Sequence, residues 1–356
     1  MIKKSLVILL FVKFIYADDT INYYNQKALL QTKISLLNQN SFTNKKITKN
    51  FIYGDSDPEI YTIKQYLSIS GEYKYDLNSN FDDNLLISLK KYQINNNLTP
   101  NGELNKKTIS SLNYNFKNIE ELLNKNYQRI LNYDFESNMI LVNIPFYNLS
   151  IYNNYNLIKN MNVIVGKPNK QTCELTSYIN NIVFNPSWYV PTSISQKEMS
   201  EKVIEDPDYF INRGFKVYYN NQEVDINNIQ NENIDPNGLK FVQTPSSKNA
   251  LGKIKFIFPN NCGIYLHDTN QKNLFGRDKQ NLSHGCVRVE APIYLATFLM
   301  SQNGYSKNKT LSYYNESATK VIHTNNYQVN IIYQNIVVND NNELVLKKDI
   351  YNKNKN

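Results

Sequence analysis

The most informative stretch of the sequence is YLHDTNQKNLFGRDKQNLSHGCVR, residues 265–288. It holds two of the chain's 3 histidines, His267 and His284, and one of its 3 cysteines, Cys286. A thiol attacks as the thiolate, so a nucleophilic cysteine needs a nearby base or a positive field to lower its pKa. His267 ends a short apolar strand, which can hold an imidazole rigidly. We therefore interpret Cys286 as a nucleophile and His267 as its base.

The turn that carries Cys286 suits acyl transfer. Gly285 has no side chain, so a substrate carbonyl can approach the backbone N–H groups that an oxyanion hole requires. Arg288 follows two residues after Cys286 and is one of only four arginines in a chain that otherwise prefers lysine. A guanidinium is suited to bidentate binding of a carboxylate, so we expect Arg288 to bind substrate.

The sequence around this stretch has the pattern of a β domain. From Met139 onward, short apolar or alternating runs rich in β-branched and aromatic residues are bounded by turn residues, which predicts mainly antiparallel strands. Residues 193–237 interrupt these runs with helix-like, polar sequence, which we interpret as a helical insertion. Pro292–Met300 is predicted to be a helix packed on the sheet. The apolar runs of residues 329–351 predict a closing strand hairpin, followed by a tail at 351–356.

The first third of the chain has helical periodicity instead. Asp57-Pro58 is a helix-starting pair, and Gly71 is a stop signal for the helix that follows. A second helix is expected to begin at Asp82 or Asp83, and a third, short one to cover residues 106–112, after the Asn101-Gly102 turn. We therefore expect a three-helix domain at 55–115, preceded by a linker or helical lead-in at 18–54. The fold class is α+β, with the β domain spanning 116–350.

The N-terminus resembles a secretory signal. Lys3 and Lys4 precede an apolar run from Ser5 to Val12, and Ala17 is a plausible last residue before cleavage. We therefore assign residues 1–17 to a signal peptide and expect an exported protein. The apolar run is shorter than the roughly 20 residues that a membrane-spanning helix needs, although retention by an N-terminal anchor is the alternative.

Net charge is +8, which favours anionic partners. The lysines are scattered and form no dense basic stripe, so we expect no nucleic acid partner.

Export would place the three cysteines in an oxidising compartment. An odd number leaves at least one thiol unpaired within the chain, and Cys286 is the economical choice. Cys173 and Cys262 are then either buried small apolar residues or a disulfide. The pattern alone leaves both possibilities open, and we favour the unpaired, buried state.

The motif H-x15-S-H-G-C-V-R resembles the signature of the L,D-transpeptidase catalytic domain. The flanking NPSWYVPTSI, NALGKIKFIFPN and YLHDTN are similar to a subgroup that also has a capping insertion and a peptidoglycan-binding module. Residues 55–115 resemble that three-helix module through their spaced apolar positions, the Tyr92-Gln93 pair and the Asn101-Gly102 turn. The resemblance spans roughly residues 55–350. It implies a β-sandwich-like catalytic domain that acts on peptidoglycan stem peptides and glycan strands in the periplasm, and that is acylated by carbapenems.

The resemblance also implies roles for individual residues. Cys286 would be the nucleophile and His267 the base and later the acid, with the backbone carbonyl of Asp268 orienting the imidazole. The N–H groups of Gly285 and Cys286 would form the oxyanion site, with Ser283 and His284 nearby. The implied product is a 3→3 cross-link. Hydrolysis to a tripeptide, and transfer of the stem to a lipoprotein, are alternatives that use the same site. The insertion at 193–237 itself combines an amphipathic stretch with the hinge-like pair Arg213-Gly214, so we expect it to fold over the cleft as a lid, with a subdomain that only stabilises the fold as the alternative.

Three other readings are less consistent with the sequence. His267, Asp268, His284 and Cys286 are potential zinc ligands, but the chain has no CxxC or His-x3-His pair, so we expect no metal and no cofactor. A papain-type protease would place the cysteine before the histidine, which is the reverse of the order here. A wall-binding protein with an inactive catalytic domain would be expected to lack Cys286 or His267, and both are present.

Overall fold

The computed structural model describes residues 21–40, 46–96, 98–229, 234–277 and 279–354 of the 356-residue chain. The predicted signal peptide at 1–17 lies outside these ranges. The chain divides into two compact units, Met1–Leu131 with Ile336–Leu346, and Asn132–Asn335 with Lys347–Asn356. In the ranges described, no helix has the length and apolar character needed to cross a membrane.

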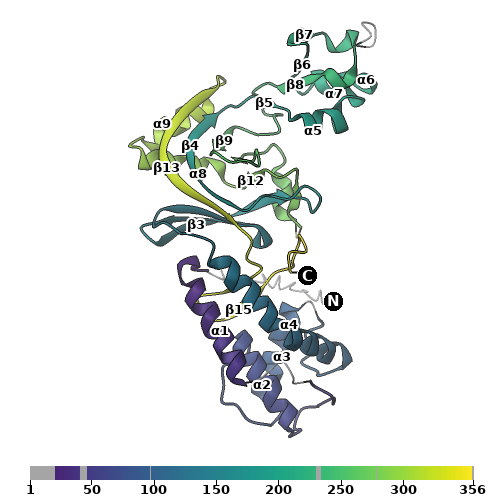
Figure 1. Ribbon diagram of the computed structural model, residues 1–356, viewed down its shortest axis with the longest axis vertical. Helices are drawn as coiled ribbons and strands as arrows, with labels where there is room; N and C mark the ends of the chain where they lie inside the picture. The colour runs from purple at the N-terminus through teal and green to yellow at the C-terminus, as the bar shows by residue number, and fades with distance from the viewer. Residues whose placement is uncertain (1–20, 41–45, 97, 230–233, 278, 355–356) are drawn as a thin grey trace, which may run out of the picture. The chain divides into compact units, whose positions relative to one another are not determined.

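The first unit is helical (Figure 1). Its helices are α1 (Gln26–Asn40), α2 (Pro58–Ser70), α3 (Asp83–Asn95) and α4 (Lys106–Ile130). The predicted start of α2 is confirmed, because the Asp57 side chain accepts from the N–H of Glu59, and Gly71 ends the helix with a φ of 98°. Asp82 likewise caps α3.

One helix end, and with it the domain boundary, differs from the expectation. The helix expected at 106–112 continues for 25 residues to Ile130, so the helical unit ends at Leu131 rather than near 115. Apolar residues spaced three or four apart, namely Phe116, Ile119 and Leu123, are buried and sustain it. Within 18–54, helix α1 packs on α4, so this segment contains a helix of the unit, as the helical lead-in reading expected.

The Tyr92-Gln93 pair is part of the interior of the helical unit. Gln93 is fully buried, and its amide nitrogen donates to the Thr108 hydroxyl and the Glu103 carbonyl, both at 3.0 Å. Its amide oxygen accepts from the N–H of Gly102 at 2.8 Å. The pair therefore holds the Asn101-Gly102 turn against α3 and is not exposed to a ligand.

The hairpin predicted near the C-terminus exists but belongs to the helical unit. Strands β14 (Ile336–Val338) and β15 (Leu344–Leu346) pair with each other and pack on α1, α2 and α4. The buried side chain of Gln26 makes two hydrogen bonds to Val338, at 2.8 Å to its N–H and 2.7 Å to its carbonyl. The expectation that this hairpin closes the catalytic sheet is therefore wrong, because its backbone and apolar side chains are satisfied by helices.

The second unit is built on a nine-stranded sheet with the order β11-β3-β12-β10-β9-β4-β13-β1-β2, and a further pairing joins β2 to β3. Most pairings are antiparallel, as predicted, while β1–β13, β10–β12 and β3–β11 are parallel. The strands are β1 (Met139–Asn143), β2 (Asn148–Asn153), β3 (Asn156–Gly166), β4 (Leu175–Phe184), β9 (Ile254–Ile257), β10 (Leu266–His267), β11 (Asn281–Ser283), β12 (Val287–Val289) and β13 (Lys320–Ile332).

Two helices accompany this sheet, α8 (Pro292–Gln302) and α9 (Lys307–Asn315). Helix α8 contacts β13 and β9, and Leu295 and Leu299 are buried in the same core as the strands. The helix predicted at Pro292–Met300 and its packing on the sheet are confirmed.

The insertion is not simply helical. It runs from Trp188 to Gln243, beyond the expected 193–237, and contains a second sheet with the order β5-β8-β6-β7, formed by β5 (Trp188–Tyr189), β6 (Phe215–Tyr219), β7 (Gln222–Val224) and β8 (Lys240–Gln243). Short helices, including α5 (Thr192–Ile194), α6 (Lys202–Glu205) and α7 (Pro207–Ile211), complete it.

The hairpin of β6 and β7, which the helical prediction missed, has a recognisable sequence signal. Phe215 and Val217 are buried while Lys216 is exposed, which is the alternation of a strand. Asn220 and Asn221 both have positive φ, at 48° and 65°, as in the two-residue turns that favour hairpins.

Candidate active site

Three neighbouring strands place three residues in a row on one face of the sheet. Strand β10 lies between β9 and β12, and His267 is opposite Lys255 on one side and Arg288 on the other. Side chains alternate along a strand, and the neighbouring pair Leu266 and Phe256 points into the core. His267 therefore faces away from the core, between two cations.

Cys286 lies beside this row, directly before β12. The N–H of Val287 donates to the carbonyl of Tyr265 at 3.1 Å, which aligns Cys286 with Tyr265. The Tyr265 ring centre is 5.5 Å from that of His267, and Nζ of Lys255 is 3.8 Å from the Tyr265 ring centre. Cys286 is the free cysteine of the described residues and is partly exposed. The structure thus brings the predicted nucleophile and base to adjacent strand ends.

Burial and the two cations determine the charge state of this pair. Burial, followed by the charge of Arg288, lowers the pKa of His267 to about 3. Burial also raises the pKa of the Cys286 thiol, although hydrogen bonds with Tyr265 and the charges of Lys255 and Arg288 oppose that rise. At neutral pH the resting pair is therefore a neutral imidazole and a protonated thiol. The cations favour the thiolate once the proton has moved to the imidazole.

The turn before Cys286 is held from several sides. Gly285 has a φ of 118°, a backbone conformation that favours glycine. Its carbonyl accepts from the Thr172 hydroxyl at 2.8 Å, and the N–H of Thr172 donates to the Tyr351 hydroxyl at 3.1 Å. The Ser283 hydroxyl donates to the Cys286 carbonyl at 2.6 Å. Ser283 therefore shapes the turn from inside it.

The two expected oxyanion donors differ in availability. The N–H of Gly285 donates to the Ser283 hydroxyl oxygen at 3.2 Å, so it is engaged within the turn. The N–H of Cys286 makes no hydrogen bond to any residue that the structure describes. The Cys286 N–H is thus the better placed of the two, and an oxyanion role for Gly285 would require it to release Ser283.

Asp268 acts in the structure through its side chain. Its buried carboxylate accepts from the N–H groups of Lys253 at 2.8 Å and Thr269 at 2.7 Å, and it pairs with Lys272. The Asp268 backbone raises the pKa of His267, but Nδ1 of His267 has no hydrogen bond of ordinary geometry with any described residue. Orientation of the imidazole by the Asp268 carbonyl stays a prediction.

His284 and Arg288 point to different neighbours. Nε2 of His284 lies 2.7 Å from a carboxylate oxygen of Glu198, which belongs to the insertion. Arg288 donates from one terminal nitrogen to the side-chain oxygen of Gln271 at 2.9 Å. Within the described residues Arg288 has no carboxylate partner, and its binding to substrate stays a prediction.

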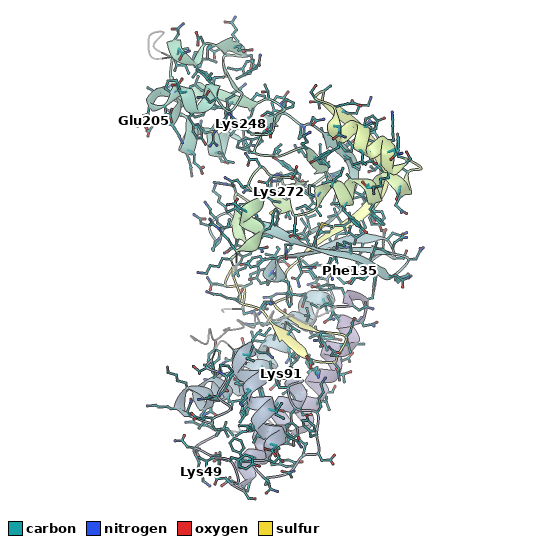
Figure 2. The ribbon with its side chains drawn as sticks, turned by 180° about the vertical axis from the view of Figure 1, so that it is seen from behind. Lys49, Lys91, Phe135, Glu205, Lys248 and Lys272 are labelled. Carbon is teal, nitrogen blue, oxygen red and sulfur yellow. A yellow bond between two sulfur atoms is a disulfide. The ribbon has the colours of Figure 1, made fainter. Side chains whose placement is uncertain are left out.

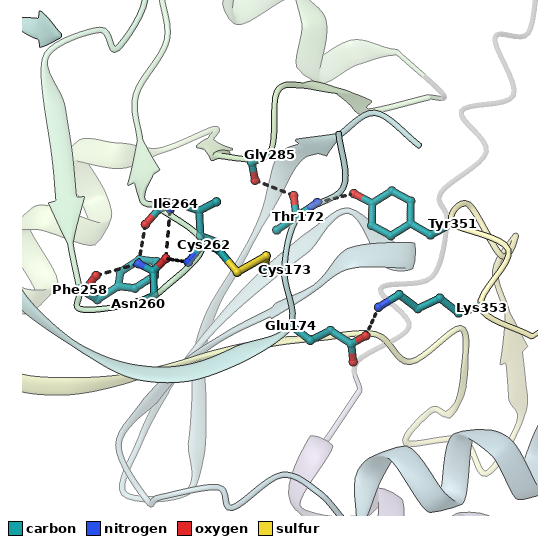
Figure 3. Close-up of a disulfide and its surroundings, with 10 residues drawn as sticks. All are labelled: Thr172, Cys173, Glu174, Phe258, Asn260, Cys262, Ile264, Gly285, Tyr351 and Lys353. Atoms are coloured by element: carbon teal, nitrogen blue, oxygen red, sulfur yellow. Dashed lines mark hydrogen bonds and ion pairs between the residues drawn. A yellow bond between two sulfur atoms is a disulfide. The ribbon is translucent and has the colours of Figure 1, made fainter. Parts of the chain in front are cut away.

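A disulfide joins Cys173 to Cys262 (Figure 3). The preference for two unpaired, buried cysteines is therefore wrong, and Cys262 is in fact exposed. The bond links the loop that leads to Tyr265 with the segment whose Thr172 holds the Gly285 carbonyl. It closes a loop of 89 residues in sequence, which no local pattern could reveal.

Cys286, His267 and Arg288 open into a cavity of about 580 Å³ that is also lined by the insertion, including Trp188. The charged residues of its described lining are mostly cations. They are Lys170, Lys202, Arg213, Lys248 and Arg288, with Glu198 as the acidic residue. Such a lining favours an anionic ligand. In the described ranges, no group of three His, Cys, Asp or Glu side chains is arranged to hold a metal ion.

Sequence reasoning missed Tyr265, Lys255 and Glu198. Tyr265 precedes His267 by two residues, so strand alternation alone would have placed it on the same face. Lys255 and Glu198 are far from the motif in sequence, and only strand register and the fold of the insertion bring them to it.

Comparison with known proteins assigns the catalytic unit. Residues 137–322, just over half of the chain, match the model of the YkuD family, the L,D-transpeptidase catalytic domain. A Haemophilus influenzae protein named "Putative L,D-transpeptidase" is 35% identical over 193 residues, which cover 54% of this chain and 40% of that protein. The chain thus spans less than half the length of this relative.

Solved structures show a weaker likeness. An L,D-transpeptidase from Mycobacterium smegmatis has 12% identity and a TM-score of 0.26, over 55% of this chain and 58% of that one. The catalytic domain of the E. faecium enzyme, acylated by ertapenem, has 13% identity and a TM-score of 0.28, over 56% of this chain and 100% of that one. These TM-scores are too low to add to the assignment, which rests on the family match. On that match, this chain belongs to the L,D-transpeptidase catalytic-domain family.

Proposed function

We propose that the protein is a peptidoglycan L,D-transpeptidase that forms 3→3 cross-links through a thioacyl intermediate on Cys286. The observation that carries this proposal is the position of Cys286 and His267 on one face of adjacent strand ends, at a cavity with a cationic lining. The stem peptides of peptidoglycan carry several carboxylates, which suits such a lining. We propose no metal or cofactor, because thiol and imidazole suffice for acyl transfer.

The first half-reaction would acylate the thiol. His267 takes the proton of Cys286 as the sulfur attacks the carbonyl of the third stem residue of a tetrapeptide. The Cys286 N–H stabilises the oxyanion, with Lys255 and Arg288 supplying positive potential nearby. Collapse of the tetrahedral intermediate breaks the peptide bond, and the imidazolium gives its proton to the departing amine of D-Ala. A base with a low pKa is a strong acid once protonated, which favours this last transfer.

The second half-reaction would release the acyl group to an amine. The side-chain amine of another stem attacks the thioester, gives a proton to His267, and the sulfur leaves and recovers that proton. Water in place of the amine gives a tripeptide, and a lipoprotein lysine gives an anchored protein. The contact between Glu198 and His284 supports the lid proposed for the insertion, because it ties the insertion to the turn beside the thiol.

We further propose that the protein works in the periplasm and that its helical unit binds peptidoglycan. The family acts on the cell wall, which supports the location, and the sequence of residues 55–115 supports the binding role. Because Tyr92 and Gln93 are buried, any such ligand would contact other residues of the unit.

The test is incubation of the purified protein with a disaccharide-tetrapeptide, followed by mass spectrometry of the protein and the products. We expect an acyl adduct on Cys286, loss of D-Ala and formation of cross-linked dimer. The Cys286→Ala variant should give neither adduct nor product, while keeping the far-UV circular dichroism of the parent. Turnover by the Cys286→Ala variant would refute the proposal.

A further inference from the structure

The part of the active-site cavity formed by the insertion has an unusual arrangement of cations. Nζ of Lys202 lies 3.6 Å from the ring centre of Tyr209, and the guanidinium carbon of Arg213 lies 4.1 Å from the same centre. Arg213 also donates to the Tyr209 hydroxyl at 3.1 Å, and Nζ of Lys248 donates to the carbonyl of Asn212 at 2.8 Å. One aromatic ring thus organises two cations, and a third is anchored beside them.

Among the residues that the structure describes, these three cations have no salt-bridge partner. Within the described residues, no carboxylate forms a salt bridge with Lys202, Arg213 or Lys248, whereas Lys216 of the same insertion pairs with Glu223 at 3.0 Å. Uncompensated cations close together repel one another, so a nearby anion would stabilise the group. All three line the cavity that contains Cys286.

A second hollow, of about 360 Å³, extends the cavity at this point. It is lined by Tyr209, Arg213, Lys248 and Asn212, together with Asn270 and Gln271 from the loop after His267. Gln271 also accepts the hydrogen bond from Arg288, so it bridges from the thiol side of the cavity to this hollow. Lys248, labelled in Figure 2, lies close to the insertion.

We infer that Lys202, Arg213 and Lys248 form an anion subsite that binds a carboxylate of the peptide stem, away from the carbonyl that Cys286 attacks. The inference rests on the proposed function for the identity of the ligand. The ligand is a flexible, partly exposed carboxylate, and the groups that hold it are a guanidinium and two ammonium groups around an aromatic ring. The carboxylate could come from the donor stem or from the acceptor stem, and the subsite adds affinity for an acidic stem over an amidated one.

Binding is measured first, in the full-length Cys286→Ala protein, so that no chemistry interferes. The probes are a tetrapeptide stem with free carboxylates and the same stem with its side-chain and α-carboxyl groups amidated. We expect Arg213→Gln to weaken binding of the acidic stem about fivefold, as for a partly exposed charge pair, and to leave binding of the amidated stem unchanged. Lys240→Gln is the matched control, because Lys240 is on the same insertion but does not line either hollow.

Kinetics of the Cys286-containing protein then identify the source of the carboxylate. In one reaction only the donor stem is amidated, and in another only the acceptor stem is amidated. The effect of Arg213→Gln should disappear in the reaction in which the amidated stem is the one that supplies the carboxylate. Equal preference for acidic over amidated stems in the parent and in Arg213→Gln would overturn the subsite, whether or not turnover occurs. Selective binding by the Cys286→Ala protein without any acylation of the parent would instead refute the proposed function and keep the subsite.

Discussion

The Cys173–Cys262 disulfide should contribute a large part of the stability of the catalytic unit. The perturbation is the double substitution Cys173→Ser and Cys262→Ser in a Cys286→Ala background, in which no free thiol can exchange with the bond. The bond spans 89 residues. Closing a loop of that length removes chain entropy from the unfolded state worth about 4.5 kcal/mol, and measured losses for native disulfides are about 2–5 kcal/mol.

Urea unfolding, followed by far-UV circular dichroism, measures this loss. We expect a lower midpoint and a slope at least as steep as that of the control, because the unfolded chain without the bond is less compact and exposes more surface. Hydrogen exchange should localise the effect to the loop before Tyr265 and to the segment around Thr172, which the bond joins. The oxidised Cys286→Ala protein is the control.

Equal unfolding midpoints for the oxidised control and the double variant would refute the reasoning. In the protein that retains Cys286, the same two serines should slow acylation without abolishing it. Thr172 would still hold the Gly285 carbonyl, but on a segment with fewer constraints. Complete loss of acylation in a folded protein would mean that the bond itself takes part in the chemistry.

Three further predictions concern charge and burial. Because the pKa of Cys286 is raised, acylation by a carbapenem should accelerate as pH rises from 7 to 9 without reaching a plateau, as followed by intact-mass measurement. The folded pKa of His267 is lowered to about 3, so the unfolded state binds one more proton between that value and about 6.5. The free energy of unfolding should therefore fall as the pH falls through this window. The fall should be steeper than in a His267→Asn variant by about 1.4 kcal/mol per pH unit, as measured by urea unfolding at each pH. Gln26→Ala leaves two buried backbone groups of Val338 without partners and should cost about 2–4 kcal/mol, with faster hydrogen exchange in the hairpin but unchanged carbapenem acylation.

Much of the candidate site was predictable because its signals are local. The spacing of His267 and Cys286, the glycine between them and the flanking apolar runs require no tertiary knowledge. The same holds for the caps of α2 and α3, because a capping side chain bonds to N–H groups two or three residues away. The site was predicted from histidine and cysteine, which are rare in this chain. The helix starts were predicted from capping rules that act over a few residues.

The errors share a different cause, which is that their physical basis lies in distant parts of the chain. The end of α4 depends on packing inside the helical unit, and the place of the 336–346 hairpin depends on Gln26, more than 300 residues earlier in the chain. Strands β5 and β7 of the insertion have only 2 and 3 residues, too few to show a period, so their pairing is seen only in the folded chain.

The sequence by itself therefore determined the family and the α+β class, and it predicted Cys286 as the nucleophile and His267 as the base. Only the tertiary structure decided the disulfide, the position of Lys255 beside His267 and the cationic wall that the insertion adds to the cavity. The physical reason is that strand register and side-chain packing bring together groups separated by tens to hundreds of residues, and neither leaves a periodic trace in the chain.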